Sequence, residues 1–271
     1  MISMTPRKHI PLSLTLLTPA VAIVLTLAVG AGIFGLLGFS PLGSLYTFFV
    51  APISRPDQIG DLFVKACPLI ITATGLVFCF RANVWNIGAE GQLVFGAIFS
   101  GWVALSFPDW PAITLMPAMV LASIIGGICW AMIPALLKVR FNTNEILVSL
   151  MLTYVAALFI DWLVRGPWRD PMSFGFPLTK MYSDAGLIHR IDVPFVGSLG
   201  QLHWGVVGAL LLAIAGSFVL SRTILGFQIK VMGDAPRGGR FAGFTPHLVT
   251  IGVMAIAGGA AGLAGMVEVS A

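Results

Sequence analysis

Long apolar stretches follow one another along this chain and leave it few ways to fold. A bilayer core about 30 Å thick needs about 20 apolar residues per helix. Of the 271 residues, 58% are hydrophobic and 10% are charged, too little polar surface for a soluble globule. We therefore expect an all-α, polytopic transmembrane helical bundle, folded as a single domain over residues 1–271. About seven spans are predicted: Leu16–Gly38, Leu62–Phe80, Leu93–Phe107, Ile113–Leu137, Ile146–Val164, Trp204–Leu220 and Leu248–Val269.

A polar run separates the second stretch from the third and contains Arg81, Asn83, Asn86, Glu90 and Gln92. Lipid offers no hydrogen-bond partners, and a charge at mid-membrane costs roughly 2.5 to 3.5 kcal/mol on insertion scales. The run must therefore face protein, a water-filled pathway or the aqueous rim. Because the third stretch is short, we expect it to continue into this run as a broken or re-entrant helix.

Two roles fit the polar run. It can be a hydrogen-bonded clamp that joins two half-helices, in which Glu90 accepts hydrogen bonds or pairs with Arg81. It can also contact a transported solute, and one network can serve both purposes.

The net charge of +4 comes from basic residues scattered among loops, which favours membrane orientation over nucleic-acid binding. If the spans alternate, one side collects Arg7, Lys8, Lys138, Arg140, Arg222, Lys230, Arg237 and Arg240. The positive-inside rule predicts that this side, with the N-terminus, is cytoplasmic. Residues 165–203 then form an external loop. The first apolar stretch is longer than the 7–15 residues of a signal-peptide core, which favours a first transmembrane helix.

The common catalytic and metal-binding motifs are absent from the sequence. It has no Gly-x-x-x-x-Gly-Lys-Ser/Thr phosphate loop, no His-Glu-x-x-His and no Gly-x-Ser-x-Gly. Cys67, Cys79 and Cys129 have no metal-like spacing and lie in apolar stretches, where we expect buried thiols. The sequence therefore predicts no catalytic residue, no metal and no cofactor.

Two glycine-rich patches lie inside apolar stretches, Gly126-Gly127 and Gly258 to Gly265. Small residues at helical spacing let helix backbones approach closely in a membrane, so we expect tight helix packing there. The chain ends at the end of an apolar stretch without a polar flank, and we expect that it is C-terminally truncated.

Three segments carry a family resemblance. Thr74–Gln92, above all Asn86-Ile-Gly-Ala-Glu-Gly-Gln92, resembles the signature of permease subunits of bacterial ABC importers in the simple-sugar and nucleoside branch. Phe141–Tyr154 is similar to the second family block, although Thr153 replaces an Asn that usually precedes the Tyr. Leu225–Phe244 resembles the third, a cytoplasmic loop in which Ala235 stands for the family's Asn and Gly238-Gly239 for its Ala-Ala pair. Family members continue past the end of this chain with further helices.

The resemblance implies a permease that moves a nucleoside or simple sugar by alternating access, in the bacterial plasma (inner) membrane. Its implied partners are a second permease subunit, an ABC ATPase subunit that hydrolyses ATP, and an extracytoplasmic solute-binding protein. The Asn-Ile-Gly-Ala-Glu-Gly-Gln form leans toward nucleosides. From the residues alone, a secondary transporter and a purely structural membrane subunit stay open as alternatives.

The third segment is implied to be a coupling loop, residues 222–246, that inserts a short helix into the ATPase. Its predicted site residues are Asp234, Pro236, Arg237, Arg240 and Phe241. Pro236 suits a first helical turn, and Asp234 just before it can cap the free amides. Arg237 and Arg240 share a helix face beside Phe241. The alternative is a basic loop that only sets topology.

Asn144 and Glu145 open the second family block. An Asn before the first turn caps a helix, and an acidic residue in that turn is favourable to the helix dipole. That account explains both residues, and a role in the substrate pathway is the alternative.

Overall fold

The computed structural model describes residues 11–174, 176–191 and 200–271. Arg7 and Lys8, which contributed to the predicted orientation, lie outside the described residues, as do residues 175 and 192–199 of the predicted external loop. The described residues form helices and no β-strand, which confirms the predicted all-α class. Its elements are α1 (Leu12–Leu36), α2 (Pro41–Phe49), η1 (Ala51–Ile53), α3 (Pro56–Arg81), α4 (Ala89–Ser106), α5 (Ala112–Phe141), α6 (Glu145–Arg165), η2 (Asp184–Gly186), α7 (Trp204–Arg222), α8 (Ile224–Asp234), α9 (Pro236–Phe241) and α10 (Pro246–Ser270).

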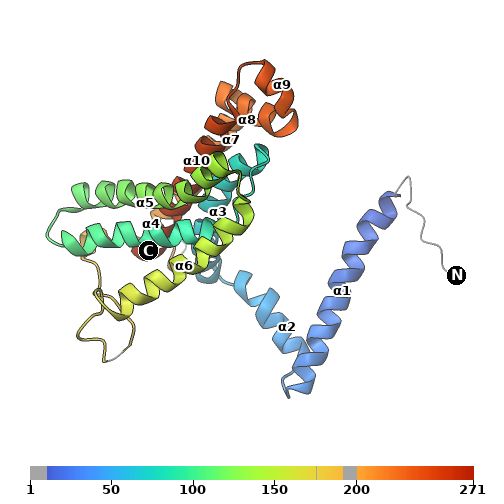
Figure 1. Cartoon of the computed structure of the whole chain (residues 1–271). Helices are drawn as coiled ribbons and strands as arrows, with labels where there is room; N and C mark the ends of the chain where they lie inside the picture. The colour runs from blue at the N-terminus through green and yellow to red at the C-terminus, as the bar shows by residue number, and fades with distance from the viewer. Residues whose placement is uncertain (1–10, 175, 192–199) are drawn as a thin grey trace. The chain divides into compact units, whose positions relative to one another are not determined.

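Within the described residues, six helices are long and apolar enough to cross a membrane: α1, α3, α5, α6, α7 and α10 (Figure 1). The predicted third stretch forms α4, which has 18 residues and is not among the six. Its first turn carries Glu90 and Gln92, and these polar side chains lower its mean hydropathy. The seven predicted spans are therefore six membrane-length helices and one shorter, more polar helix.

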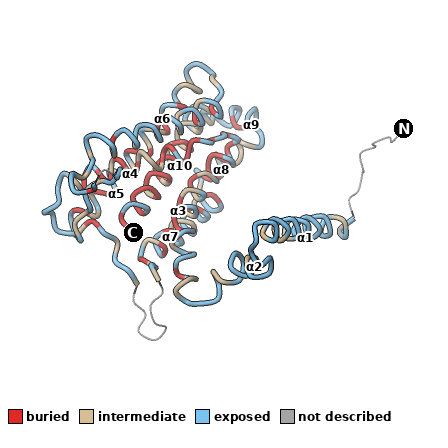
Figure 2. Tube along the Cα trace, turned by 90° about the horizontal axis from the view of Figure 1, so that it is seen from below, coloured by how far each residue is buried: buried red, intermediate tan, exposed pale blue. Residues whose placement is uncertain are grey.

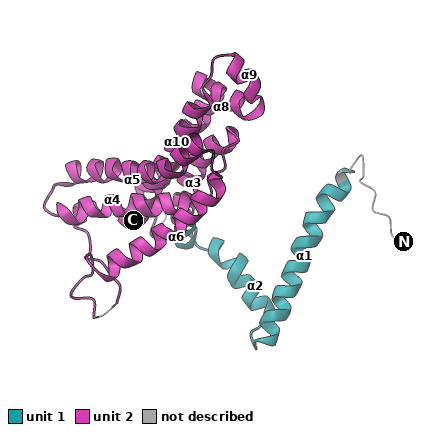
Figure 3. Ribbon diagram, viewed as in Figure 1, with its two compact units in different colours: residues 1–62, 194–200 teal, residues 63–193, 201–271 magenta. Residues whose placement is uncertain are grey.

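The chain divides into two compact units (Figure 3). The first comprises residues 1–62 and 194–200 and contains α1, α2 and η1. Within it, α1 and α2 pack through the rings of Phe34 and Phe48, whose centroids are 5.7 Å apart. The second comprises residues 63–193 and 201–271 and contains the packed helical core. A single domain over the whole chain remains a prediction.

The core of the second unit is built where α4, α5 and α10 meet along glycines. α10 is the most buried of the long helices (Figure 2), and half of its most apolar window lies inside the protein. A Cβ on Gly96 of α4 would collide with the backbone of Gly262, and one on Gly127 of α5 would collide with the carbonyl of Gly258. The prediction that the glycine-rich patches mediate close helix packing is confirmed.

A second cluster joins α3 to α8 and α10. Phe78 of α3, Ile229 of α8 and Met254 of α10 are all buried there. Cys67 is buried as predicted, whereas Cys129 is exposed on α5, so its predicted burial is wrong. Cys79 is also buried, and its thiol donates to the Val253 carbonyl oxygen at 3.2 Å. These contacts hold the C-terminal end of α3, where the polar run begins, against the segment that follows α7.

Candidate functional site

The polar run connects α3 to α4 as a non-helical segment, residues 82–88. Asn83 adopts a left-handed conformation with φ 57°, which Asn tolerates better than most residues, and it ends α3. α4 then begins at Ala89, inside the polar run and four residues before the predicted apolar stretch. The run is therefore a helix junction whose backbone turns at Asn83.

Two carboxamides pair at the centre of this junction. Asn86 Nδ2 donates to Gln92 Oε1 at 3.0 Å, and Gln92 Nε2 donates back to Asn86 Oδ1 at 3.0 Å. Asn86 Oδ1 also accepts from the backbone N–H of Gly88 at 3.1 Å. Both side chains are only 1% exposed. This reciprocal pair fixes the segment before α4 to the first turn of α4.

The junction is anchored on α6 as well. The Ile87 N–H donates to Ser149 Oγ at 3.2 Å. Gly88 lies so close to Ser149 that a Cβ there would stand 2.8 Å from the Ser149 carbonyl oxygen. The glycine of the Asn-Ile-Gly motif is therefore required by close approach to a neighbouring helix.

An ion pair joins α5 to α6 beside the junction. Lys138 Nζ lies 2.5 Å from Glu145 Oε2, and Glu145 is 7% exposed. Lys138 lies near the end of α5 and Glu145 is the first residue of α6, so the pair ties these two helix ends together. Asn144 caps α6 by accepting from the Ile146 N–H at 3.0 Å, as its sequence position predicted.

Arg81, Asn83 and Glu90 lie outside this buried network, because all three are exposed. Of the two alternatives for a clamp, the ion pair between Arg81 and Glu90 is not formed in the described structure. The reason is local geometry: the junction buries Asn86 and Gln92 and leaves the charged residues at its outer faces. Sequence reasoning missed Ser149 as a partner and treated Lys138 only as a topology signal, since neither is near the run in the chain.

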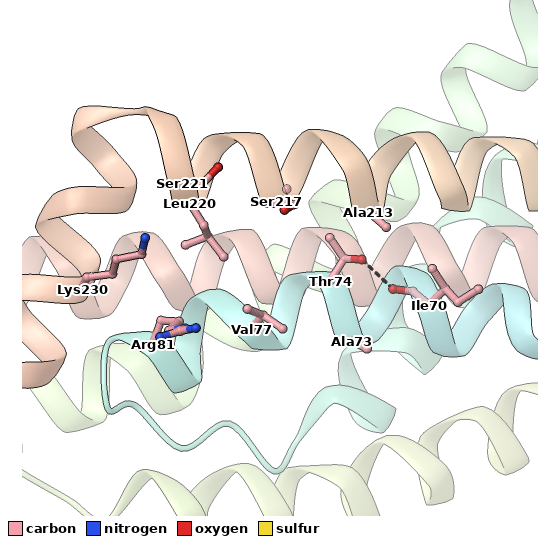
Figure 4. Close-up of a pocket in the computed structure, with 11 residues that line it drawn as sticks. Ile70, Ala73, Thr74, Val77, Arg81, Ala213, Ser217, Leu220, Ser221 and Lys230 are labelled. Carbon is pink, nitrogen blue, oxygen red and sulfur yellow. Dashed lines mark hydrogen bonds between the residues drawn. The ribbon is translucent and has the colours of Figure 1, made fainter.

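Arg81 instead lines a cavity of about 470 Å³ between α3 and α7 (Figure 4). Lys230 of α8 lies with it at one end of the cavity, and Ile70 and Ala213 lie at the other. We call this cavity the α3–α7 groove.

A helical hairpin, α8–α9, follows α7 and precedes α10. Phe227 of α8 and Phe244 after α9 pack edge to face across the hairpin, with their ring centroids 6.2 Å apart. Gly239 is buried, and a Cβ there would collide with the Met232 sulfur. The second glycine of Gly238-Gly239 therefore allows α9 to pack closely on α8.

The predicted coupling residues lie on this hairpin. α9 begins with Pro236 at its first turn, as expected. Arg237, Arg240 and Phe241 are exposed, and Phe241 is 96% exposed. The cap expected from Asp234 is wrong: Ala235 occupies the N-cap position, and no side chain caps α9. Asp234 is instead the last residue of α8, a helix that the sequence analysis did not predict.

Within the described residues, no group of three or more His, Cys, Asp or Glu side chains could hold a metal ion. The buried polar groups of the junction are carboxamides, a hydroxyl and one ion pair, which bind through hydrogen bonds. Such an arrangement positions helices and offers no nucleophile paired with a base.

Comparison with known proteins identifies the family. Residues 58–271 match the family described as the permease component of the branched-chain amino acid transport system. The chain belongs to this family. The match includes the helix junction, the α3–α7 groove and the hairpin.

Several curated permeases are similar to this one over nearly all of its length. The glucose ABC transporter permease protein TsgB13 of Haloferax volcanii is 32% identical, over 99% of this chain and 72% of that protein. The guanosine permease protein NupP of Bacillus subtilis is 30% identical, over 93% of this chain and 71% of that protein. The nucleoside permease protein NupB of Lactococcus lactis is 28% identical, over 93% of this chain and 70% of that protein. No solved structure matches the permease significantly.

Together, the six membrane-length helices and these relatives establish a multi-pass membrane protein that is a transport component of the ABC permease type.

Proposed function

We propose that this permease carries a nucleoside or simple sugar into the cell by alternating access, driven by ATP that a separate subunit hydrolyses. The observation that carries the proposal is the family match over residues 58–271, which includes an exposed basic hairpin between two membrane-length helices. A secondary transporter needs no such hairpin, and a purely structural subunit needs no exposed aromatic at its tip.

The hairpin is proposed as the contact with the ATPase. An exposed Phe241 flanked by Arg237 and Arg240 suits an aromatic anchor with a basic rim. Motion at α9 would reach α3 through α8, because a Cβ at Gly233 would collide with the Arg81 carbonyl. Packed elements of this kind transmit rigid-body movement rather than absorb it.

The junction between α3 and α4 is proposed to be a rigid part of the permease that keeps its internal geometry during transport. Asn86, Gln92 and Glu145 are buried and hydrogen-bonded, so the start of α4, the end of α5 and the start of α6 would move together. Glu90, Asn83 and Arg81 are exposed at its outer faces and remain available to the substrate pathway or to a partner.

The proposed solute is uncharged and rich in hydroxyl groups. Relatives are named for glucose, guanosine and nucleosides, which share that chemistry. The Asn86-to-Gln92 form supports a nucleoside over a hexose. A second permease and an extracytoplasmic solute-binding protein would complete the importer.

The proposed topology places the N-terminus and α8–α9 in the cytoplasm and residues 165–203 outside, as part of the docking surface for the binding protein. Phe174 and Met181 are 99% and 95% exposed, as a docking surface requires. A membrane-impermeant thiol reagent should reach Met181→Cys in intact cells but not Ala242→Cys. The reverse pattern would invert the topology.

Reconstitution tests the function directly. The permease would be co-expressed with its neighbouring ATPase and binding-protein genes, purified as a complex and placed in liposomes. ATPase activity should rise with binding protein plus guanosine or glucose, and uptake of labelled solute should require ATP. Uptake without an ATPase would indicate a secondary transporter. An assembled complex whose ATPase never responds to binding protein and solute would indicate a structural subunit.

A further inference from the structure

The α3–α7 groove has an amphiphilic lining. One end holds Arg81 and Lys230, and Figure 4 shows both side chains at the same end, beyond Val77 and Leu220. The wall between the two ends is mainly apolar, with Ala73, Val77 and Leu220. Charge is therefore confined to one end of a mainly apolar groove that also holds three hydroxyl side chains, Thr74, Ser217 and Ser221.

The two cations have no ion-pair partner among the residues that the structure describes. Among the described residues, neither Arg81 nor Lys230 forms an ion pair, and Lys230 is partly buried. Two like charges that line one cavity repel each other unless an anion lies between or beside them. The groove end therefore complements a negatively charged group.

Two of the three hydroxyls on the wall are bonded to their own helix, and the third, that of Ser217, forms no hydrogen bond in the described structure. The Thr74 hydroxyl donates to the Ile70 carbonyl at 2.7 Å, which Figure 4 marks, and the Ser221 hydroxyl lies 3.4 Å from the Phe218 carbonyl. Hydroxyls bonded to their own helix are tolerated next to hydrocarbon. A sugar moving along this wall would lose its water without gaining equivalent partners.

The length of the groove matches one leaflet of a bilayer. Ile70 and Arg81 mark its two ends on α3, and at a rise of 1.5 Å per residue they are about 16 Å apart along the helix. A hydrocarbon core of about 30 Å has leaflets of about half that thickness. With α3 along the bilayer normal, the cations would lie at the level of the headgroups and Ile70 near the midplane.

We propose that the α3–α7 groove binds one anionic phospholipid, with its phosphate on Arg81 and Lys230 and an acyl chain along Ala73, Val77 and Leu220. The site is on the side of Lys138, Arg140 and the basic hairpin, which the charge distribution assigns to the cytoplasm, where anionic lipid is attractive to such residues. The lipid would bridge α3, α7 and α8, and so would couple the hairpin to the membrane.

The complete transporter would be tested in nanodiscs of phosphatidylcholine alone or mixed in equal parts with phosphatidylglycerol. Native mass spectrometry would count retained lipids for wild type, Arg81→Gln, Lys230→Gln and the double variant. We expect wild type to retain phosphatidylglycerol preferentially and the double variant to lose that preference on the order of tenfold. Arg140→Gln removes an exposed charge on the same side but outside the groove, and it should retain the preference.

Ala73→Phe separates lipid from a soluble anion, because it fills the apolar wall and leaves both cations in place. It should reduce phosphatidylglycerol retention, and inorganic phosphate should not displace the lipid from wild type. Displacement by inorganic phosphate would overturn the proposal in favour of a phosphate site. Equal retention of phosphatidylglycerol in wild type and the double variant would overturn it as well. So would a disulfide crosslink between the Ser217→Cys side chains of two permease copies that retain no lipid, because the groove would then be an interface between copies.

Discussion

Two polar regions interrupt the apolar sequence of this permease, and they are built in opposite ways. The junction between α3 and α4 buries Asn86 and Gln92, and each makes hydrogen bonds with the other. The hairpin α8–α9 exposes Arg237, Arg240 and Phe241. A polar group that has its partners inside the chain stabilises the fold, whereas an exposed group is available to another molecule. The contrast therefore separates scaffold from contact surface.

The largest effect is expected at the junction. Asn86→Ala leaves the Gln92 amide and the Gly88 N–H buried without partners, which should cost about 3 kcal/mol, since each such group costs about 1 to 3. The melting temperature of the purified complex would measure it. Asn83→Gly is the matched control, because it removes an exposed amide and glycine accepts the left-handed backbone. Equal losses in both variants would contradict a buried pair.

Lys138→Ala should destabilise the permease by about 2 to 3 kcal/mol, because it leaves the Glu145 carboxylate largely buried and unpaired. The double change Lys138→Met with Glu145→Gln should recover much of this loss. Arg140→Ala, at an exposed position on the same helix end, should cost no more than about 0.5 kcal/mol. Thermal melts would compare the three variants. A double variant that is less stable than Lys138→Ala would assign Glu145 another role.

Phe241→Ala should leave the melting temperature of the permease unchanged and weaken its association with the ATPase by about 2 kcal/mol, the loss typical of an aromatic anchor. Uptake should fall with association. Phe174→Ala, which removes an equally exposed ring from residues 165–203, is the control and should not alter ATPase binding. Normal uptake with Phe241→Ala and with Arg237→Glu plus Arg240→Glu would leave the hairpin a topological role only.

His203 is buried like the junction residues but lacks part of their hydrogen bonding, so it tests which of the two features determines stability. This residue is 2% exposed and therefore as buried as the junction residues. Its Nδ1 accepts a hydrogen bond from the Gly205 N–H at 3.2 Å and so caps α7. Its Nε2 has no hydrogen-bond partner in the described part of the chain. Burial lowers the pKa of His203, and the Glu268 charge opposes this more weakly. Below about pH 6.5 the unfolded chain binds a proton that the folded one resists, so stability should decrease as pH falls toward the lowered pKa.

Melts at about pH 8 and about pH 5 would measure this difference. His203→Asn keeps a capping acceptor and does not titrate, so the stability of this variant should depend less on pH than that of the wild type. Identical pH dependence in both proteins would show that protonation of His203 has no cost.

The smallest effect on stability is expected at Glu90. Glu90→Ala removes an exposed side chain from the polar run and should change stability by no more than about 0.5 kcal/mol. Uptake is the informative readout. Reduced uptake at an unchanged melting temperature would assign Glu90 to the substrate pathway, and a reduced melting temperature would contradict its separation from the Asn86–Gln92 pair.

The fold was predictable because its signals are local. The apolar stretches, the cap at Asn144 and the glycine patches can each be recognised in a short window of sequence. The polar run was recognised too, but its division into buried Asn86 and exposed Glu90 was not. The partners around the junction, Ser149 on α6 and the Lys138–Glu145 pair between α5 and α6, come from helices distant in the sequence.

The cap at α9 was mispredicted for a related reason. Propensity places Asp234 well for capping, but packing of α8 on α3 extends α8 through that residue. Tertiary contact thus overrides local preference at the hairpin. The α3–α7 groove was not predictable either, because Arg81 and Lys230 are 149 positions apart and meet only in the folded chain.

The positions of the native thiols make the permease suitable for labelling at introduced cysteines. Cys67 and Cys79 are buried, and Cys129 is exposed on α5, within a helix of membrane length. Water-soluble maleimides reach thiols that are in contact with water, and all three native thiols lie on helices of membrane length. The unmodified chain should therefore be silent toward such reagents in intact membranes. An introduced cysteine would then report its own position without prior removal of the native ones, and fluorescent or spin labels could follow the hairpin during turnover.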